Sequence, residues 1–480
     1  MSPFLLGFIV YLVLILVTAS LTLRMNKTQA DFLLAGRRLN VWVATLSERA
    51  SGESAWLLLG LPAAAMTMGL VESWTVIGII AGIGFSWWAV ASGLRRETEK
   101  YQALTLPEYF ARRFGGSGQM IRVVAALIII FFYSFYVSAQ FNGAGKVLHV
   151  TLDLPQGTGI AIGAVIIILY TMMGGFFAVA WTDVVQALIM FSTLVILPIV
   201  ALTELSDQGL SLEASGTMAS WTGGKTGWAA VAAIISGLSW GLGYSGQPHT
   251  VTRYMSFKKI EQIKKGRVVA LVWAVPAFLG AMVIGLVGYK LYPAGTFTDS
   301  EQLMPFMATQ LLPGWLAGIF VSGAIAAMMS TADSQLLVGT SAIAEDILHR
   351  GLGIELSPKR LVLMSRLVTL GLGAAGFLLA LYSDKLIFSM VSYAWSGLGS
   401  SFGPAILLTL HWKKCTGRGV LAGMMTGAAS TVIWSNIDFL ENAISVRLVS
   451  FVLASLAIVI FSLLDSKSSS RNEGRAECPT

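Results

Sequence analysis

Residues 47–65 read SERASGESAWLLLGLPAAA, and this stretch decides how the chain folds. Its second half is strongly apolar, whereas its first half carries charges and small residues: Glu48, Arg49, Ser51, Gly52 and Glu53. In water, such a segment would be a capped surface helix. In a lipid bilayer, it would be a membrane helix that polar residues interrupt. The composition of the whole chain decides between these two interpretations.

The composition indicates a membrane protein. The chain has 480 residues, of which 55% are hydrophobic and 12% charged, and its mean hydropathy is +0.73. A soluble globular chain has about 25% charged residues. The isoelectric point near 9.3 could suggest nucleic-acid binding, but the basic residues lie in short loops between apolar runs, which is typical of membrane topology. The bilayer is therefore the expected solvent.

Neither disulfides nor a metal cluster are expected. The two cysteines, Cys415 and Cys478, suggest no disulfide framework. No two of the four histidines share ligand spacing. The first twenty residues have no basic start and a long apolar run, so we expect a retained first span rather than a signal peptide.

Thirteen apolar segments are long enough to cross about 30 Å of hydrocarbon. They are residues 3–23, 40–70, 73–94, 118–150, 157–177, 182–203, 227–252, 267–291, 311–343, 360–383, 386–410, 418–436 and 446–466.

The basic residues predict the orientation of these spans. If the N-terminus is outside, most basic residues, Arg253 among them, lie on inner loops, and the outer side holds five basic residues: Lys146, Lys225, Lys290, Lys385 and Arg447. Inner loops are the ones that carry excess Lys and Arg. We therefore predict a multi-pass protein of the plasma (bacterial inner) membrane, with a cytoplasmic C-terminus.

A second interrupted segment matches the first. Residues 236–250 read SGLSWGLGYSGQPHT and break the seventh span, five spans after the break at Ser51-Gly52. Paired interruptions in two halves of a chain indicate an inverted-repeat transporter with its site at the bilayer midplane. The alternative is that small residues only let helices pack closely.

Several motifs give the chain a resemblance to a known family. They are LAGRRL (34–39), WLLLGLP (56–62), ALTLPEYF (103–110), GGFFAVAWTDVVQ (174–186), WGLGYSGQPH (240–249), AAMMST (326–331), AIAEDI (342–347) and VSYAWSGLGSSFGP (391–404). With them the chain resembles the sodium/solute symporter family, in particular its sodium/proline branch.

This resemblance implies an all-α membrane protein with about 13 transmembrane helices. Its core would be ten helices in two inverted five-helix repeats, with discontinuous first and sixth core helices. The implied divisions are an extra helix and loop (1–39), the first repeat (40–203), the second repeat (204–410), two extra helices (411–466) and a disordered cytoplasmic tail (467–480).

The resemblance also implies a sodium site made of oxygen atoms, which a hard cation prefers. Its ligands would be the carbonyls of Ala50, Glu53 and Ala327 and the hydroxyls of Ser330 and Thr331. The last three share one helix face, although such hydroxyls can also bond to their own preceding turn. The family's pattern has an aspartate at Gly52, so here the carboxylate is displaced to Glu53, whose side chain could pair with Arg49.

A second sodium site is an open alternative. Some family members have one, and the matching residues here would be Asp183, Ser330, Asp333 and Ser334. Carboxylates inside a membrane indicate function by default. Asp183 could instead cap a helix.

The substrate pocket is expected beside the two breaks. By motif match its residues would be Ser54, Trp56, Gly60, Tyr136, Trp240, Tyr244, Gln247 and Pro248. Aromatic walls would cover an apolar ring, and freed N–H groups at a half-helix would hold a carboxylate. The alternative for each aromatic residue is ordinary helix packing.

Together these features predict sodium-coupled uptake of a small amino acid, most directly L-proline, with sodium as the coupling ion. We expect membrane lipid around the chain, no nucleic acid and no obligatory protein partner. The alternatives are symport of another small solute, or a sensor or channel on the same fold; a sensor would need a signalling domain, and only a short polar tail follows the last span. No catalytic motif is present, so an enzyme is not expected.

Overall fold

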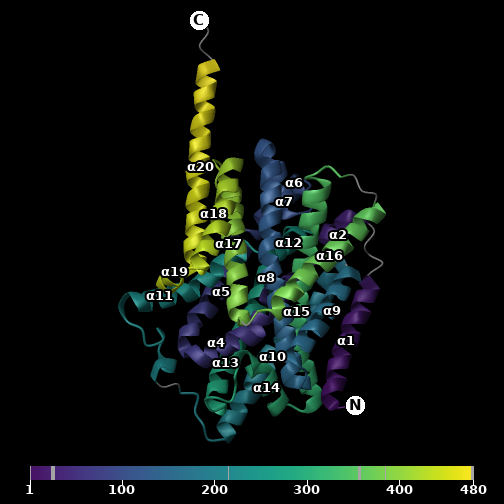
Figure 1. Ribbon diagram of the computed structural model, residues 1–480, viewed down its shortest axis with the longest axis vertical. Coiled ribbons are helices and arrows are strands. Elements are labelled where there is room, and N and C mark those ends of the chain that lie inside the picture. Colours follow the sequence, from purple (N-terminus) through teal and green to yellow (C-terminus); the bar gives the residue numbers. More distant parts are fainter. Residues whose placement is uncertain are drawn as a thin grey trace.

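The computed structural model describes residues 2–22, 28–173, 175–213, 216–354, 358–383 and 385–476, and within these ranges it is a bundle of helices without a β-strand (Figure 1). Parts of four predicted divisions lie outside the described residues: 1 and 23–27 in the first division, 174 in the first repeat, 214–215, 355–357 and 384 in the second repeat, and 477–480 in the tail.

Each of the thirteen predicted spans coincides with a helix or with a broken pair of helices. These are α1 (Pro3–Thr22), α3 with α4 (Val41–Ala55 and Leu61–Met68), α5 (Ser73–Ala89), α8 (Gly118–Leu152), α9 (Gln156–Met173), α10 (Phe176–Asp207), α11 with α12 (Gly227–Leu238 and Pro248–Met255), α13 (Gln262–Leu291), α15 (Gly314–Ser341), α16 (Pro358–Leu381), α17 (Ile387–His411), α18 (Gly417–Ser435) and α20 (Val446–Ala476). Nine helical stretches of the described chain are long and apolar enough to cross a membrane. The all-α fold class is confirmed, whereas the number of crossings stays a prediction.

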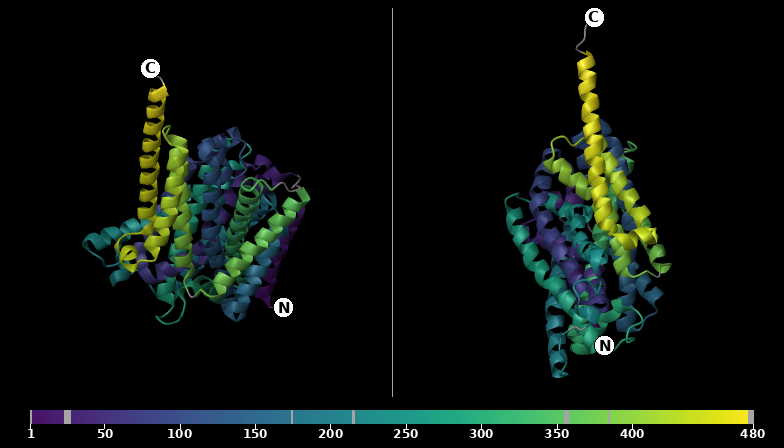
Figure 2. Two further views of the ribbon diagram at one scale, coloured as in Figure 1. Left: turned by 45° about the horizontal axis from the view of Figure 1, so that its top comes forward. Right: turned by 90° about the vertical axis from the view of Figure 1, so that its left-hand side faces the viewer.

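Short helices join the long ones. They are α2 (Gln29–Leu34), α6 (Ala91–Lys100), α7 (Leu106–Phe114), α14 (Leu303–Leu311) and α19 (Asp438–Ala443). The last helix, α20, continues to Ala476 and projects from the bundle (Figures 1 and 2). The tail that was predicted to be disordered from residue 467 therefore begins inside a helix.

The first predicted break is real, but it lies further along the chain than expected. Ser51 and Gly52 are helical, and the backbone leaves the helix at Ser54, where φ is 50° and ψ is −177°. This conformation is energetically unfavourable for a serine, because its Cβ crowds the backbone at positive φ. After it, Trp56–Gly60 form a wider π-helical turn that leads into α4. The segment Val41–Met68 therefore consists of two half-helices that meet at Ser54.

The second break agrees with its prediction. After α11, residues Ser239–Ser245 form a 3-10 helix, and Pro248 starts α12 at the position where proline costs no hydrogen bond. Glycine is required here for close approach. A Cβ at Gly243 would lie 1.9 Å from Trp395 Nε1, so only glycine lets the indole of α17 pack against the broken segment.

The two broken segments lie at the centre of the bundle. Helix α3 packs against α10, α15, α13 and α12, and the 3-10 segment Ser239–Ser245 packs against α5 and α17. Helix α15 is buried along almost its whole length, whereas α1 and α20 expose apolar side chains on the outside. The interrupted backbone is thus enclosed by protein, as a bilayer requires.

Candidate functional site

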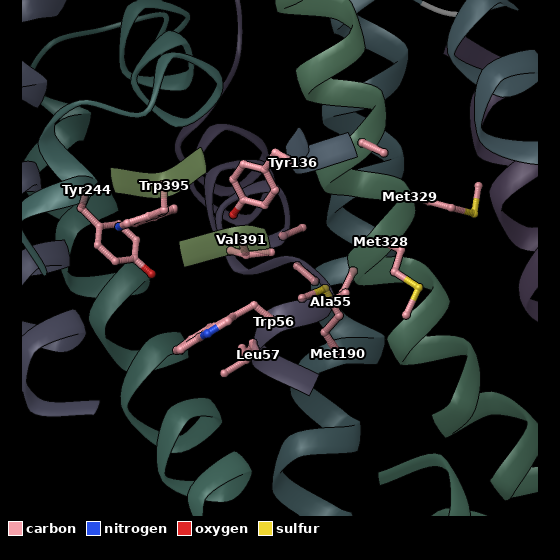
Figure 3. Packing of buried hydrophobic residues seen from close by; sticks show 14 of the residues in the cluster. Ala55, Trp56, Leu57, Tyr136, Met190, Tyr244, Met328, Met329, Val391 and Trp395 are labelled. Carbon is pink, nitrogen blue, oxygen red and sulfur yellow. The ribbon is translucent and has the colours of Figure 1, made fainter. Parts of the chain in front are cut away.

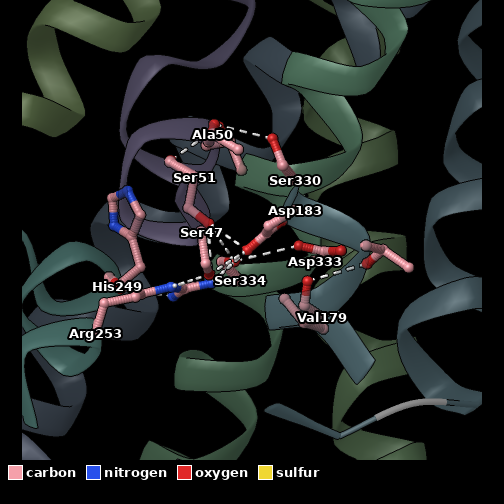
Figure 4. A network of polar contacts seen from close by, with 12 residues as sticks. Ser47, Ala50, Ser51, Val179, Asp183, His249, Arg253, Ser330, Asp333 and Ser334 are labelled. Carbon is pink, nitrogen blue, oxygen red and sulfur yellow. Dashed lines mark hydrogen bonds and ion pairs between the residues drawn. The ribbon is translucent and has the colours of Figure 1, made fainter. Parts of the chain in front are cut away.

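Oxygen atoms of two helices meet beside the break of α3. The Ser330 hydroxyl donates to the Ala50 carbonyl at 2.9 Å and to the Ala327 carbonyl at 3.1 Å (Figure 4). The neighbouring Thr331 hydroxyl donates to the Ser51 carbonyl at 3.0 Å. All these residues are fully buried. This donor set, carbonyls and hydroxyls without sulfur or nitrogen, fits a hard cation such as sodium.

The break explains why these carbonyls are available. In an uninterrupted helix, the Ala55 N–H would bond to the Ser51 carbonyl. Here the Ala55 N–H donates to the side-chain oxygen of Gln140 at 3.0 Å, and the Ser51 carbonyl accepts from Thr331. The end of a half-helix also carries a partial negative charge. The backbone geometry therefore directs partial negative charge towards α15.

Glu53 lies beside this oxygen set, and its side chain belongs to an ion pair. Its carbonyl accepts the N–H of Trp56, and within the described chain no hydrogen bond joins it to Ser330 or Thr331. Its carboxylate lies 2.6 Å from the Arg49 guanidinium and accepts the Tyr244 hydroxyl at 3.0 Å. The Arg49 pairing that the sequence suggested is present, and Glu48 is a second carboxylate partner of the same arginine.

An aromatic cluster lies next to this ion pair. The Trp56 and Trp240 rings are 4.8 Å apart, and Phe388 lies 5.4 Å from Trp240. Tyr244 packs edge-on against Trp395 at 4.7 Å. Figure 3 shows Trp56, Tyr136, Tyr244 and Trp395 around one region between the broken helices and α17. The structure thus gathers Trp56, Trp240 and Tyr244, as the sequence predicts, and adds two rings from α17.

Two buried polar atoms in this region have no hydrogen-bond partner among the described residues. They are Trp56 Nε1, a donor, and Gln247 Oε1, an acceptor. The other end of the Gln247 amide donates to the Trp395 carbonyl at 3.0 Å, which fixes the side chain. Buried polar groups are normally paired. The donor and the acceptor left open beside these aromatic rings are therefore available to a polar ligand.

The remaining predicted pocket residues surround the same segments. Gly60 follows Trp56 by one turn, and a Cβ there would lie 3.3 Å from the indole. Ser54 is the residue of the break and accepts the Trp56 N–H at 3.2 Å. Tyr136 packs edge-on against His249 at 6.0 Å, and Pro248 begins α12.

A large cavity borders the aromatic cluster. Its volume is about 1410 Å³, and its lining includes Trp240 and Phe388. Three of the five basic residues predicted to be outside also line it, namely Lys225, Lys385 and Arg447. The cavity therefore joins the predicted outer side to Trp240.

The four residues of the second sodium alternative divide into two groups. Asp183, Asp333 and Ser334 lie together, with a Ser334 hydroxyl to Asp333 contact of 3.2 Å, whereas Ser330 bonds to Ala50. Asp183 accepts the hydroxyls of Ser47 at 2.6 Å and Ser51 at 3.0 Å. It lies within α10, which starts at Phe176, so the helix-cap alternative is wrong.

Sequence reasoning missed several residues of this centre. Arg253, interpreted as an inner-loop charge, is fully buried in α12 and contacts Asp183. Gln140, Phe388 and Trp395 were not named either. Trp395 lies inside the motif at 391–404, which could have indicated it, and Arg253 lies only five residues after Pro248, too close to the break to be a loop residue.

Comparison with known proteins identifies a family model and relatives that match most of this chain. The family model described as "Sodium:solute symporter family" matches residues 32–427. The chain is 35% identical to the sodium/proline symporter of Escherichia coli K12 over 481 residues, covering 99% of this chain and 95% of that protein. It is 36% identical to the high-affinity proline transporter PutP of Bacillus subtilis over 440 residues, covering 90% of this chain and 92% of that protein.

Solved structures share the fold. A substrate-bound, outward-open sodium-coupled sialic acid symporter superposes with a TM-score of 0.75 at 20% identity, covering 97% of this chain and 98% of that one. Mhp1, a nucleobase-cation-symport-1 family transporter, superposes with a TM-score of 0.59 at 13% identity, covering 93% of this chain and 96% of that one.

Proposed function

The chain belongs to the sodium:solute symporter family, and from this premise we propose that it takes up a small amino acid, L-proline in the first place, together with sodium by alternating access. The relatives that support this are sodium/proline symporters at about 35% identity over nearly the full length. The single observation of the structure that carries the proposal is the oxygen cluster at the break of α3, directly beside an aromatic cluster with open polar atoms.

Sodium would bind where α3 and α15 meet. Its ligands would be the carbonyls of Ala50 and Ala327 and the hydroxyls of Ser330 and Thr331, and the Ser51 carbonyl is an additional candidate. Glu53 keeps the assignment made from the resemblance, a carbonyl ligand, as a proposal. An ion there would link the broken helix to α15, because each helix supplies part of the oxygen set.

The amino acid would bind in the aromatic cluster. Proline is a zwitterion with an apolar ring, and Trp56, Trp240 and Tyr244 offer flat apolar surfaces for the ring. The Trp56 indole N–H would donate to the carboxylate, and the Gln247 side-chain oxygen would accept from the ammonium. The remaining expected pocket residues, Ser54, Gly60, Tyr136 and Pro248, would complete the wall around them.

The ion gradient would supply the work. Moving one elementary charge across 100 mV is worth about 2.3 kcal/mol, and about 1.4 kcal/mol corresponds to a tenfold concentration ratio. One sodium ion per zwitterion would therefore support an accumulation of tens-fold before the sodium concentration gradient is added.

We place the protein in the plasma membrane, the inner membrane of a bacterium, with the N-terminus outside. The large cavity supports this orientation, since predicted outer lysines line it. The start of α1 and the end of α20 also lie at opposite ends of the molecule (Figure 1).

Uptake into proteoliposomes tests the proposal. Purified protein would be offered a panel of labelled amino acids with an inward sodium gradient, and with potassium in place of sodium as the control. We expect proline uptake that requires sodium and that excess unlabelled proline inhibits. Sodium-dependent uptake of a different solute alone would favour the alternative substrate, and ion currents far above carrier turnover would favour a channel.

A further inference from the structure

A buried arginine on the wall of the large cavity is not used by the proposed transport site. Arg447 is in the first turn of α20, is 9% exposed and lines the cavity. Its guanidinium lies 4.4 Å from the centre of the Trp240 ring, and Trp240 packs against Trp56 at 4.8 Å. The arginine and the proposed proline pocket therefore share one aromatic ring.

The groups of the described chain that bond to this guanidinium are all neutral. It donates to the hydroxyls of Ser239 at 3.2 Å and Ser392, and to the carbonyl and the hydroxyl of Ser236. Its Nη1 atom carries two N–H groups and makes one of these contacts, so at least one N–H has no partner among the described residues. A positive charge without a paired carboxylate is costly inside a membrane. The open N–H is therefore available to an anionic group.

A buried carboxylate on the same cavity is also incompletely paired. Glu72 ends the 3-10 turn Gly69–Glu72 that precedes α5, is 8% exposed and lines the cavity. Its Oε2 atom is buried and has no hydrogen-bond partner among the described residues. Glu72 and Arg447 interact electrostatically, but neither a hydrogen bond nor an ion pair joins them in the described chain. Two opposite charges thus line one cavity, and each has an open atom.

The other charges of the cavity are exposed. They are the side chains of Lys225, Lys385 and Glu441. Among the described residues, the lining therefore carries three cations and two carboxylates. The positive excess attracts an anionic group into the cavity, whereas Glu72 repels a simple anion. A zwitterion satisfies both conditions, because it has one charge for each of the two buried groups.

We propose that Arg447 and Glu72 form a second amino-acid site in the outer cavity, which the zwitterionic substrate occupies before it enters the aromatic pocket. Arg447 donates a charge-assisted hydrogen bond to the carboxylate of the substrate, Glu72 accepts one from its ammonium, and the Trp240 ring covers its apolar part. The inference rests on the proposed uptake of a small amino acid and adds an entry site to it.

Arg447 also has a packing role, which the test must separate from ligand binding. Its serine contacts connect α20 to α11 and α17. Loss of these contacts would lower stability whatever the ligand is. Glu72 makes none of them, and Glu72→Gln keeps the shape of the side chain while it removes the charge. The two variants therefore share a defect only if one ligand binds both residues.

The number of bound substrate molecules tests the inference in the intact protein. Binding of radioactive L-proline to purified protein is measured in sodium, up to concentrations far above those that saturate uptake. We expect two molecules per wild-type protein, and one in Arg447→Met and in Glu72→Gln. Arg447→Lys, which keeps the cation, should retain two. One molecule in wild type would overturn the inference, and this count decides even if a variant does not fold.

Competition identifies the chemistry of the second site. Prolinamide lacks the carboxylate and N-acetylproline lacks the ammonium, so neither should displace the second proline at concentrations at which unlabelled proline does. Displacement by inorganic phosphate as effective as that by proline would overturn the inference, because it would indicate a site for simple anions.

Transport kinetics test the role in entry. In Arg447→Met, the external proline concentration for half-maximal uptake should rise about tenfold, as expected for a lost hydrogen bond to a charged group, at a similar maximal rate. Lys290→Met is the matched control, since Lys290 is also predicted to be outside but is not part of the cavity lining. This variant should bind two prolines and transport like wild type. An unchanged half-maximal concentration in Arg447→Met would overturn the inference.

The outcomes separate the inference from the proposed function. Failure of the proposed function would appear as wild-type protein whose uptake of every amino acid tested is independent of sodium. Sodium-driven proline uptake with one bound proline per protein would overturn only the entry site.

Discussion

Replacing Ser330 with alanine should weaken sodium binding strongly while it leaves the fold intact. The Ser330 hydroxyl is fully buried and touches carbonyls of both helices, Ala50 at 2.9 Å and Ala327 at 3.1 Å. An interaction of a hydroxyl with a charged group is worth about 1.5–3 kcal/mol, which corresponds to an affinity change of about 10- to 150-fold. We expect the sodium concentration for half-maximal uptake to rise by a factor in this range.

The maximal rate should change much less, because sodium at sufficient concentration still fills the site. Uptake of labelled proline into proteoliposomes, measured over a wide range of sodium concentrations, gives both quantities. Sodium-induced quenching of tryptophan fluorescence reports the binding step independently of transport.

The same helix offers a matched control. Ser322 is also fully buried in α15, and its hydroxyl donates to the Gly318 carbonyl of its own helix at 2.7 Å. Ser322→Ala removes a buried hydroxyl of the same kind, at a folding cost of about 1 kcal/mol, but should leave sodium dependence unchanged. A Ser330→Ala protein with the sodium dependence of wild type would refute the assignment, and so would an equal loss in both variants.

Three further changes probe other parts of the centre. Trp56→Phe keeps a flat ring but removes the indole N–H, so the proline concentration for half-maximal uptake should rise about tenfold, as expected for a lost hydrogen bond to a charged group; unchanged affinity would move the carboxylate elsewhere. Glu53→Gln removes the charge near the ion but keeps the backbone, and sodium affinity should fall only several-fold; complete loss of the sodium response in folded protein would make the carboxylate a direct ligand. Lys146→Met removes the cation 2.5 Å from the buried carboxylate of Glu301 and leaves it only its backbone N–H donors. Breaking a buried ion pair costs about 3–5 kcal/mol, so the thermal melting temperature of the purified protein should fall clearly; an unchanged melting temperature would show that the pair is not stabilising.

The helices could be predicted because their signal is local. Apolar runs and polar loops predicted segments that each coincide with a helix or with a broken pair of helices. Serine, glycine and proline also indicated both interruptions. The exact position of the first break could not be predicted, since Ser54 adopts its positive φ in a tertiary setting where Gln140 of α8 accepts the N–H of Ala55.

Arg253 was misinterpreted for a related reason. An arginine near the end of an apolar segment indicates an inner loop, and its short distance from Pro248 is the one local sign that separates it from the lysines that follow. Its actual environment depends on Asp183, which is 70 positions earlier in the chain. Only the packing of α12 against α3 and α10 shows that the two charges meet.

The buried charges around the break of α3 favour the binding of a cation rather than an anion. Six acidic and arginine side chains around it are fully or almost fully buried: the carboxylates of Glu48, Glu53, Asp183 and Asp333 and the guanidinium groups of Arg49 and Arg253. Four negative and two positive formal charges leave an excess of two negative charges within the bundle. Uncompensated charge is costly at membrane depth, so a sodium ion at the adjacent carbonyls relieves part of this excess. The excess favours binding of a cation there, and the two arginines offset half of the formal negative charge.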